Sequence, residues 1–296
     1  MSGEVVKWAD VAMYTAPKTR VEDDGLIVPR VTLRYMTPQP LQALAAAARG
    51  YEGVPVRDIN EISQNIALKW FEDMSKTVLA MPLEWIDFDF YFEGVTRAWM
   101  DQLRTQRTAA YVAESLRFAV KEDAEFAVVK PPSIADLKDD DPKRVIWDEA
   151  VYDMAKAYNS LINAGIPAED ARGLLPMNIA TRISYKTNLR ALVPHSGMRL
   201  CSQAQHEWKQ VWAGMLDAIA NYGPPEDRWQ QQEILRLFRP ICYQTGRCQF
   251  RAETDRYCSI RDRVEGHYAR GEKPAQWVDI HPFEALREGA ARKAPE

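Results

Sequence analysis

The chain has 296 residues, of which 46% are hydrophobic and 27% are charged. This length is sufficient for one large or two small domains with a sizeable core, and the hydrophobic content excludes a disordered protein. The 38 basic and 42 acidic residues give a formal charge of −4, which provides no positive field for binding a nucleic-acid polymer. A local basic pocket for one small anion is still compatible with this charge.

The beginning of the sequence, MSGEVVKWADVAMY, lacks the basic start and the apolar run of a signal peptide, and no stretch of 18 residues is free of charge. We therefore expect a soluble cytoplasmic protein without a membrane partner. The cysteines are too few for a secreted disulfide scaffold, and the spacings of the last three match no compact zinc motif. We expect ordinary buried thiols and no metal site at Cys201, Cys242, Cys248 and Cys258.

Short alternating runs in the first 40 residues, VKWADVAMY and LIVPRVTLRYM, predict two strands around the turn EDDG. Apolar residues at steps of three and four then predict helices in LQALAAAARGY and INEISQNIALKWFEDMSKTVLAM. The segment LEWIDFDFYFEG alternates strictly and predicts a half-buried strand. The following stretch WMDQLRTQRTAAYVAESLRF contains neither glycine nor proline, which favours a helix on which Arg107 and Glu114 would share a face.

The second half of the chain predicts a polar loop in PPSIADLKDDDPKR and then a helix in DEAVYDMAKAYNSLINAG, with Gly165 as its stop. A short helix at 167–171 precedes a strand in NIATRISYKTNLRAL. Two further helices follow in SQAQHEWKQVWAGMLDAIANY and WQQQEILRLF, and the charged tail EALREGAARKAPE lacks an apolar face.

These elements predict an α+β fold in which an antiparallel sheet packs against helices, as a single domain with peripheral helices. We divide it into a core at 1–220 and a C-terminal helical extension at 221–296, which carries the cysteine segment and the charged tail.

Common catalytic motifs are absent. The sequence contains no GxxxxGK[ST], GxGxxG, HExxH or GxSxG, and only four histidines. An enzyme with this sequence would therefore depend on arginine side chains and a cofactor.

Residues 171–208 place four arginines among apolar residues: Arg172, Arg182, Arg190 and Arg199. A guanidinium does not lose its proton on burial, so each needs a carboxylate, a phosphate or carbonyl oxygens as its partner. Within the run, the acid available is Glu207. Salt bridges to distant acids explain this pattern as well as a site for a phosphorylated, planar ligand does. The polar groups of residues 99–118 are likewise compatible with a solvated helix face carrying an ion pair.

The string EWIDFDFYFEGVTRAWMDQLRTQRTAAYVAESLRF resembles the signature region of the flavin-dependent thymidylate synthases. The matching positions are Glu84, Gly94, Val95, Thr96, Arg97, Ala98, Gln102, Leu103, Arg107, Ser115 and Arg117. A second region matches independently, at Ala171, Arg172, Leu175, Pro176, Asn178, Asn188, Arg190, Arg199, Ala204, Gln205 and Glu207. The resemblance covers residues 40 to 220.

This resemblance implies a homotetramer that binds FAD and makes dTMP from dUMP, with methylenetetrahydrofolate as carbon donor and NADPH as reductant. It implies Arg199 as the catalytic residue beside the pyrimidine, where its charge would stabilise negative charge as C5 becomes nucleophilic. The implied nucleotide-binding residues are Gln102, Glu114, Ser115, Arg117, Arg172 and Arg199. The implied flavin-binding residues are Thr105, Gln106, Arg107, Asn188 and Arg190.

The chain departs from the family pattern at several positions. The Arg-His-Arg triplet is Thr105-Gln106-Arg107, and the glutamate expected two residues before Ser115 is Ala113, with Glu114 one position later. Three explanations follow: altered flavin contacts with an unchanged reaction, C5 methylation or hydroxymethylation of another pyrimidine nucleotide such as dCMP or UMP, or a non-catalytic nucleotide-binding or assembly protein.

Overall fold

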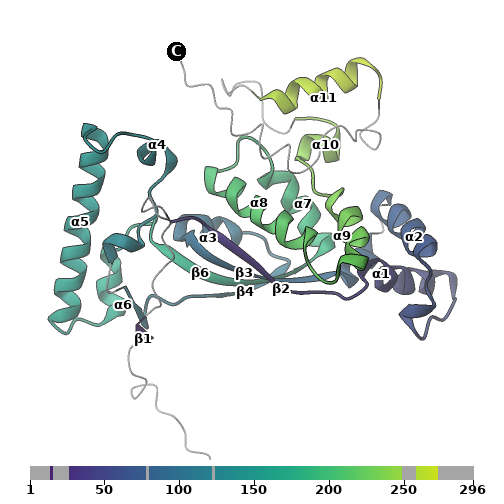
Figure 1. Ribbon diagram of the computed structural model, residues 1–296, viewed down its shortest axis with the longest axis horizontal. Coiled ribbons are helices and arrows are strands. Elements are labelled where there is room, and N and C mark those ends of the chain that lie inside the picture. Colours follow the sequence, from purple (N-terminus) through teal and green to yellow (C-terminus); the bar gives the residue numbers. More distant parts are fainter. Residues whose placement is uncertain (1–13, 16–26, 78–79, 122–123, 249–257, 273–296) are drawn as a thin grey trace, which may run out of the picture. The chain divides into compact units, whose positions relative to one another are not determined.

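The computed structural model describes residues 14–15, 27–77, 80–121, 124–248 and 258–272 (Figure 1). Its internal contacts divide the chain into two compact units. The first unit comprises Met1–Val28, Glu93–Asp101 and Val112–Ile183, and the second comprises Pro29–Phe92, Gln102–Tyr111 and Ser184–Glu296.

A four-stranded antiparallel sheet has the order β2-β3-β6-β4. Its strands are β2 (Arg30–Met36), β3 (Asp87–Thr96), β4 (Ala109–Ala113) and β6 (Ala180–Asn188). Two short strands, β1 (Tyr14–Thr15) and β5 (Ala119–Val120), form a separate parallel pair. The strands expected in LIVPRVTLRYM and LEWIDFDFYFEG are confirmed, as is that in NIATRISYKTNLRAL up to Asn188, whereas residues 189–192 begin a helix. The strand expected in VKWADVAMY lies outside the described residues except for its last residue.

The alternation in β3 places three phenylalanines on the buried face of the second unit. Phe88, Phe90 and Phe92 are fully buried, and consecutive ring centroids lie 5.9 Å apart. Tyr185 of β6 continues this stack, with its ring centroid 6.0 Å from that of Phe92. Burying each ring contributes about 1.5–3 kcal/mol, so this aromatic row fixes the register of the central strands.

Most of the described helices belong to the second unit. They are α1 (Pro40–Arg49), α2 (Gln64–Lys76), α7 (Leu189–Arg199), α8 (His206–Ala220), α9 (Arg228–Leu235), α10 (Ile241–Thr245) and α11 (Ser259–Ala269). Helix α8 packs on β2 (Figure 1). A Cβ at Gly214 would lie 2.7 Å from Cγ2 of Val31, so this glycine permits the close approach of α8 to the strand.

The first unit contains the long helix α5 (Pro142–Asn163) with the short helices α4 (Pro132–Ala135) and α6 (Ala168–Ala171). Asp141 accepts a hydrogen bond from the main-chain N–H of Lys143 at 2.9 Å and caps α5. Gly165 follows the helix with a φ of 84°, a conformation that disfavours other residues. The expected stop at Gly165 is confirmed. The segment expected to be a loop at 131–144 contains α4 and the first turn of α5.

Helix α3 (Arg97–Leu103) follows β3 directly. Single 3₁₀ turns complete the described elements at Gly50–Glu52, Ile59–Glu61, Met81–Trp85, Ala124–Ala127, Arg172–Leu174 and Pro225–Asp227.

The helix expected across residues 99–118 is wrong. Helix α3 ends at Leu103, and β4 occupies 109–113. The main-chain N–H of Glu114 donates to the carbonyl of Arg182 at 2.8 Å, so this segment is held by pairing along the sheet. A lack of glycine and proline permits a helix but does not require one. Arg107 and Glu114 therefore do not share a helical face.

The expected α+β class, with an antiparallel sheet and packed helices, is confirmed. The expected helix at 59–81 is shorter, since α2 covers only Gln64–Lys76. The division into a core at 1–220 and an extension at 221–296 stays a prediction, and the charged tail lies outside the described residues. No helix in the described part of the chain is long and apolar enough to span a bilayer.

Candidate functional site

Arg199 is the last residue of α7, and its guanidinium is held by neutral groups. One terminal nitrogen donates to Oε1 of Gln102 at 3.0 Å, and the other donates to the main-chain oxygen of Gln102 at 3.2 Å. The guanidinium carbon lies 4.5 Å from the ring centroid of Trp208, within the range of a cation–π contact. These contacts fix the position of the cation without neutralising its charge.

The Nε donor of Arg199 is buried and has no hydrogen-bond partner among the described residues. Burial lowers the pKa of Arg199, yet a guanidinium keeps its proton under all ordinary conditions. A partly desolvated cation with an unsatisfied donor favours an anion or a carbonyl-bearing ligand beside it.

His195 lies one helical turn before Arg199 and is only 3% exposed. Its ring meets the edge of Trp208 at a centroid distance of 5.2 Å. Neither ring nitrogen has a hydrogen-bond partner in the described part of the chain. Burial, and secondly the charge of Arg199, lower the pKa of His195 to about 3, so the imidazole is neutral near pH 7. We call Gln102, His195, Arg199 and Trp208 the Arg199 cluster.

The orientation of the Gln102 amide is fixed on both sides. Its Oε1 accepts hydrogen bonds from Arg199 and from Nε1 of Trp208, the latter at 2.9 Å. Its Nε2 donates to Oε1 of Gln205 at 2.5 Å, and Gln205 in turn donates to Glu207 at 3.4 Å. The segment Ala204-Gln205-His206-Glu207 therefore orients the residue that holds Arg199.

The turn at 104–108 is tied down by Gln106. Its Nε2 donates to the carbonyl of Ala191 at 3.3 Å, and its Oε1 accepts from the hydroxyl of Tyr185 at 2.6 Å. The hydroxyl of Tyr111 is shared between the carbonyl oxygens of Gln106 and Leu103, at 2.6 and 3.0 Å. Gln106 is thus a structural residue of this turn, whatever else it binds.

Thr105 and Arg107, the neighbours of Gln106, differ in whether their side chains hydrogen-bond to the protein. The hydroxyl of Thr105 donates to the carbonyl of Gln102 at 2.7 Å. Arg107 is exposed, and its guanidinium has no hydrogen bond or ion pair in the described part of the chain. Arg107 is therefore the residue of the triplet that is available for a ligand.

The other two expected flavin-binding residues lie at the start of α7. Oδ1 of Asn188 accepts from the main-chain N–H of Ala191 at 3.0 Å and caps this helix. Arg190 donates to Oε1 of Glu84 at 2.6 Å, and both side chains are nearly half exposed. Such an exposed ion pair is weak, so Arg190 can turn to an anionic ligand at little cost.

In the first unit, Glu169 holds two of the arginines expected to bind a nucleotide. Its carboxylate pairs with Arg117, with N–O distances of 2.7 and 2.8 Å, and its main-chain carbonyl accepts from Nε of Arg172 at 3.0 Å. Both arginines are exposed. The hydroxyl of Ser115 accepts from the main-chain N–H of Arg117 at 3.4 Å. Glu169 thus contacts both guanidinium groups, one through its carboxylate and one through its main-chain carbonyl.

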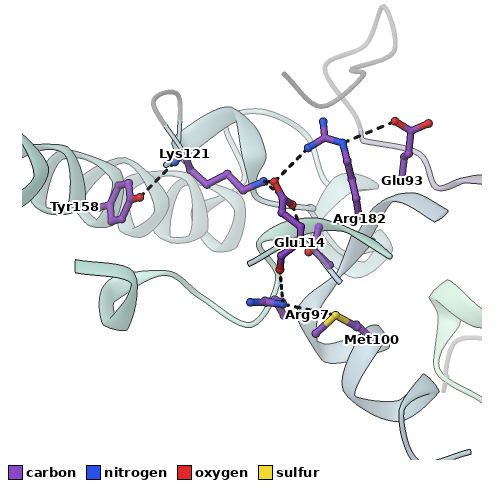
Figure 2. A network of polar contacts seen from close by, with 8 residues as sticks. Glu93, Arg97, Met100, Glu114, Lys121, Tyr158 and Arg182 are labelled. Carbon is purple, nitrogen blue, oxygen red and sulfur yellow. Dashed lines mark hydrogen bonds and ion pairs between the residues drawn. The ribbon is translucent and has the colours of Figure 1, made fainter. Parts of the chain in front are cut away.

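Figure 2 shows that Glu114 lies in a network of buried charges in the first unit. Nζ of Lys121 binds both carboxylate oxygens of Glu114 at 3.0 and 3.1 Å, and a terminal nitrogen of Arg182 lies 3.3 Å from one of them. Arg97 donates to the main-chain oxygen of Glu114 at 3.3 Å. Burial lowers the pKa of Lys121, and the charge of Glu114 opposes that shift. The assignment of Glu114 to the nucleotide stays a prediction, since its carboxylate already has two cationic partners.

The structure brings together some of the expected site residues but not all of them. Gln102 and Arg199 contact each other in the second unit, and Arg117 and Arg172 share Glu169 in the first. The expected nucleotide-binding set is therefore distributed over both units.

Comparison with known proteins identifies the family. The family model described as "Thymidylate synthase complementing protein" matches residues 32–224. A flavin-dependent thymidylate synthase from Geobacter sulfurreducens is 31% identical over 221 residues, which are 74% of this chain and 90% of the relative. The chain belongs to the flavin-dependent thymidylate synthase family. The resemblance of the two motifs is thereby confirmed.

Other members of the flavin-dependent thymidylate synthase family agree. The protein of that name from Pyrococcus furiosus is 32% identical over 225 residues, covering 74% of this chain and 88% of the relative. A thymidylate synthase from Helicobacter pylori, crystallised with FAD and dUMP, matches 70% of this chain and 99% of its own with a TM-score of 0.50 at 18% identity. A UMP/dUMP methylase from Streptomyces cacaoi, crystallised with 5-Br dUMP, matches 65% and 90% with a TM-score of 0.51 at 20% identity. These two structures share the fold.

The four cysteines lie at the C-terminal side of the family match or beyond it, and none of them forms a disulfide. The expectation of buried thiols holds only for Cys242, since Cys201 and Cys258 are partly buried and Cys248 is exposed. Burial raises the pKa of Cys242 to about 12 and also raises that of Cys201. The hydroxyl of Ser202 contacts Sγ of Cys258 at 3.2 Å. Among the residues that the structure describes, no three His, Cys, Asp or Glu side chains are arranged to hold a metal ion.

Several residues of the site were not found from the sequence. Trp208 and His195 belong to the Arg199 cluster, Glu169 contacts Arg117 and Arg172, and Lys121 pairs with Glu114. The family motifs matched in the sequence do not include these positions. Glu169, His195 and Lys121 each lie within seven residues of a site residue, but such spacing alone does not single them out.

Proposed function

We propose that this member of the family catalyses the reductive methylation of dUMP at C5. The balanced reaction is dUMP, methylenetetrahydrofolate, NADPH and one proton giving dTMP, tetrahydrofolate and NADP⁺. The C5 proton of the pyrimidine is lost, and the new methyl group consists of the folate methylene and a hydride equivalent.

The observation that carries this proposal is the state of Arg199. Its guanidinium is held by Gln102 and Trp208, which are neutral, and its Nε is buried without a hydrogen-bond partner. A pyrimidine offers carbonyl oxygens and a ring nitrogen to such a group. When C5 becomes nucleophilic, negative charge develops on the O4–C4 side of the ring, and a fixed cation in a dry environment stabilises it strongly.

The neutral state of His195 supports this role. A second positive charge one turn away would repel Arg199 and raise the cost of holding it in this partly buried position. Because the pKa of His195 is lowered to about 3, the imidazole contributes no charge near pH 7. Of these two groups, only the guanidinium then contributes a positive charge at the proposed pyrimidine position.

The phosphate of the nucleotide is assigned to Arg117 and Arg172, with Ser115 as an additional donor. Both guanidinium groups are exposed, and the ion pair between Arg117 and Glu169 is about half exposed. Such a pair stabilises the fold by only about 0–1 kcal/mol, so a doubly charged phosphate can compete for Arg117. In this assignment Glu114, bound to Lys121, fixes the loop before Ser115.

The residues proposed for the cofactor fit FAD. Arg107 presents a guanidinium that has no partner in the described chain, and Arg190 is held only by an exposed pair with Glu84. Two exposed guanidinium groups suit a diphosphate. Asn188 caps α7 and so sets the direction of Arg190. Thr105 and Gln106 hold the turn that presents Arg107.

When bound, FAD would relay the reducing equivalents of NADPH to the transferred carbon. The protein residues would bind the nucleotide, polarise the pyrimidine and exclude water from it. The expected homotetramer and the cytoplasmic location belong to the same proposal, and light scattering on the purified chain tests the assembly.

The experiment measures how fast the protein releases labelled hydrogen from C5 of dUMP when methylenetetrahydrofolate and NADPH are supplied. The protein is purified with or without added FAD. We expect a yellow protein with a flavin absorbance band and turnover that falls at least about a hundredfold in Arg199→Ala. Arg236→Ala is the matched control, because Arg236 is an exposed arginine just after α9 that pairs with Glu233. A colourless protein that does not bind added FAD would contradict the proposal and favour a non-catalytic role.

The substrate is tested with dUMP, UMP and dCMP in parallel, and the product is identified as methyl or hydroxymethyl by mass spectrometry. Turnover of dUMP to dTMP supports the proposal. Turnover restricted to UMP or dCMP would establish the alternative, a C5 methylase or hydroxymethylase of another pyrimidine nucleotide.

A further inference from the structure

Helix α7 carries Arg190 near its start and Arg199 at its end, but its sequence is a poor helix former. LRALVPHSGMR contains Pro194 inside the helix and Gly197 three residues later. Proline removes one main-chain hydrogen bond and clashes with the preceding turn, and glycine increases the freedom of the unfolded backbone. The segment that positions Arg199 therefore requires support from outside the helix.

That support comes from α10, which lies beyond the residues matched by the family model. Nε2 of Gln244 donates to the carbonyl of Val193 at 2.9 Å and lies 3.2 Å from the hydroxyl of Ser196. It also lies 2.8 Å from the carbonyl of Arg239, so the amide links the segment just before α10 to the middle of α7. The contacted residues, Val193 and Ser196, flank Pro194.

Gly197 provides the space for this contact. A Cβ at this position would lie 2.9 Å from Nε2 and 3.1 Å from both Cδ and Oε1 of Gln244. The amide therefore lies directly against the glycine backbone. The φ angle of Gly197 is not in the left-handed region, so steric contact with Gln244, and not backbone conformation, makes glycine suitable here.

The extension makes a second contact just after the end of α7. Cys242 of α10 belongs to a small core with Ile260 and Val264 of α11, and Cys258 packs against it. Sγ of Cys258 lies 3.2 Å from the hydroxyl of Ser202. The segment from Val193 to Ser202 is thus held on both sides of Arg199 by the extension.

We propose that the C-terminal extension is a positioning element for the nucleotide site, and that Gln244, through its contact with Gly197 and the carbonyl of Val193, sets the position of Arg199. This inference rests on the proposed function of Arg199. Gln244 is a positioning residue, since it contacts α7 and not Arg199 itself.

The test uses the full-length protein and measures the dissociation constant of dUMP by calorimetry, together with KM and kcat. Gln244→Ala should weaken dUMP binding about tenfold, equivalent to one to two net hydrogen bonds. The matched control is Gln232→Ala, because Gln232 is an exposed glutamine of α9, and we expect its dissociation constant to be unchanged. All constants are measured at a temperature at which circular dichroism shows each variant fully folded.

A double-mutant cycle separates positioning from general destabilisation. Gly197→Ala alone should displace the Gln244 amide and weaken dUMP binding as much as Gln244→Ala does. In the Gln244→Ala background the same change should have no further effect, because the space is then free. Additive losses, or a folded Gln244→Ala protein that binds dUMP as tightly as wild type, would overturn the inference. Absence of dUMP binding in the wild type would instead contradict the proposed function.

Discussion

His195 gives a prediction about stability that depends on one buried group. Its pKa is lowered from 6.5 to about 3, first by burial and then by the charge of Arg199. Between about pH 3 and 6.5, His195 therefore binds a proton in the unfolded chain but not in the folded chain. The free energy of unfolding therefore rises with pH between about 3 and 6.5, and the contribution is lost as the pH falls below 6.5.

The magnitude follows from the two pKa values. At about pH 5 the unfolded histidine is almost fully protonated, and the native one is not, so this residue alone lowers the free energy of unfolding by about 2 kcal/mol relative to about pH 7.5. About four fifths of this difference arises below about pH 6.5. It is large compared with the total stability of a typical domain, about 5–15 kcal/mol.

The perturbation is His195→Leu, which leaves an apolar side chain against Trp208 and removes the titrating group. Urea unfolding followed by tryptophan fluorescence at about pH 7.5, 6.5, 5.8 and 5 gives the slope for each protein. The wild type should lose about 2 kcal/mol more than the variant over this range. His206→Phe is the control, since it leaves the contribution of His195 in place. An equal slope in wild type and His195→Leu would refute the assignment of a buried, neutral imidazole.

Three further changes test the packing around the site. Gln106→Leu removes the amide that binds Tyr185 and the carbonyl of α7, and it should lower the free energy of unfolding by about 1–3 kcal/mol in urea titrations; no loss would show that the turn does not depend on it. Lys121→Met leaves the carboxylate of Glu114 buried with less positive charge beside it, so calorimetry should show a loss of about 3–5 kcal/mol, and a stability equal to wild type would contradict the proposed network. Gly94→Ala introduces a Cβ at a φ of 69°, 3.1 Å from the carbonyl oxygen of Val28, and should cost about 1–3 kcal/mol in chemical denaturation; an unchanged midpoint would show that the strand adjusts freely.

The parts of the fold that the sequence predicted are those in which local pattern and tertiary environment agree. In β3 the period of two in Phe88, Phe90 and Phe92 matches a face that is fully buried. In α5 the predicted stop at Gly165 has the conformation that ends a helix, whereas the Asp141 cap lies in the segment expected to be a loop, so only the end of this helix was predicted. Such elements are recognisable because each residue has the same preference as its neighbours.

Residues 99–118 show why the remainder was not predictable. Nothing in AAYVA excludes a helix, and the segment becomes a strand because the main chain pairs with β6, about 70 residues later. Helix α7 was missed for the opposite reason. Pro194 and Gly197 weaken its local signal, and its stability depends on Gln244, which is distant in sequence.

Some residues of the site were likewise predictable from the sequence and others were not. The motifs pointed to Gln102 and Arg199, which do contact each other. They did not point to Trp208 or His195, because a tryptophan or a histidine on an amphipathic helix looks like any core residue until its neighbours are known. The electrostatic character of the Arg199 cluster depends on these neutral neighbours as much as on the arginine.

The altered triplet can now be interpreted in physical terms. A substitution that removed a ligand-binding imidazole and left an unsatisfied polar group would destabilise the turn. Gln106 leaves no such group unsatisfied, since the oxygen of its amide accepts from Tyr185 and the nitrogen donates to the carbonyl of Ala191. Its hydrogen-bonding capacity stabilises the turn that carries Arg107 and holds it against the first turn of α7. In the proposed FAD site, the contribution of this triplet to the cofactor then falls mainly to Arg107, so Arg107→Ala should weaken FAD binding far more than Gln106→His.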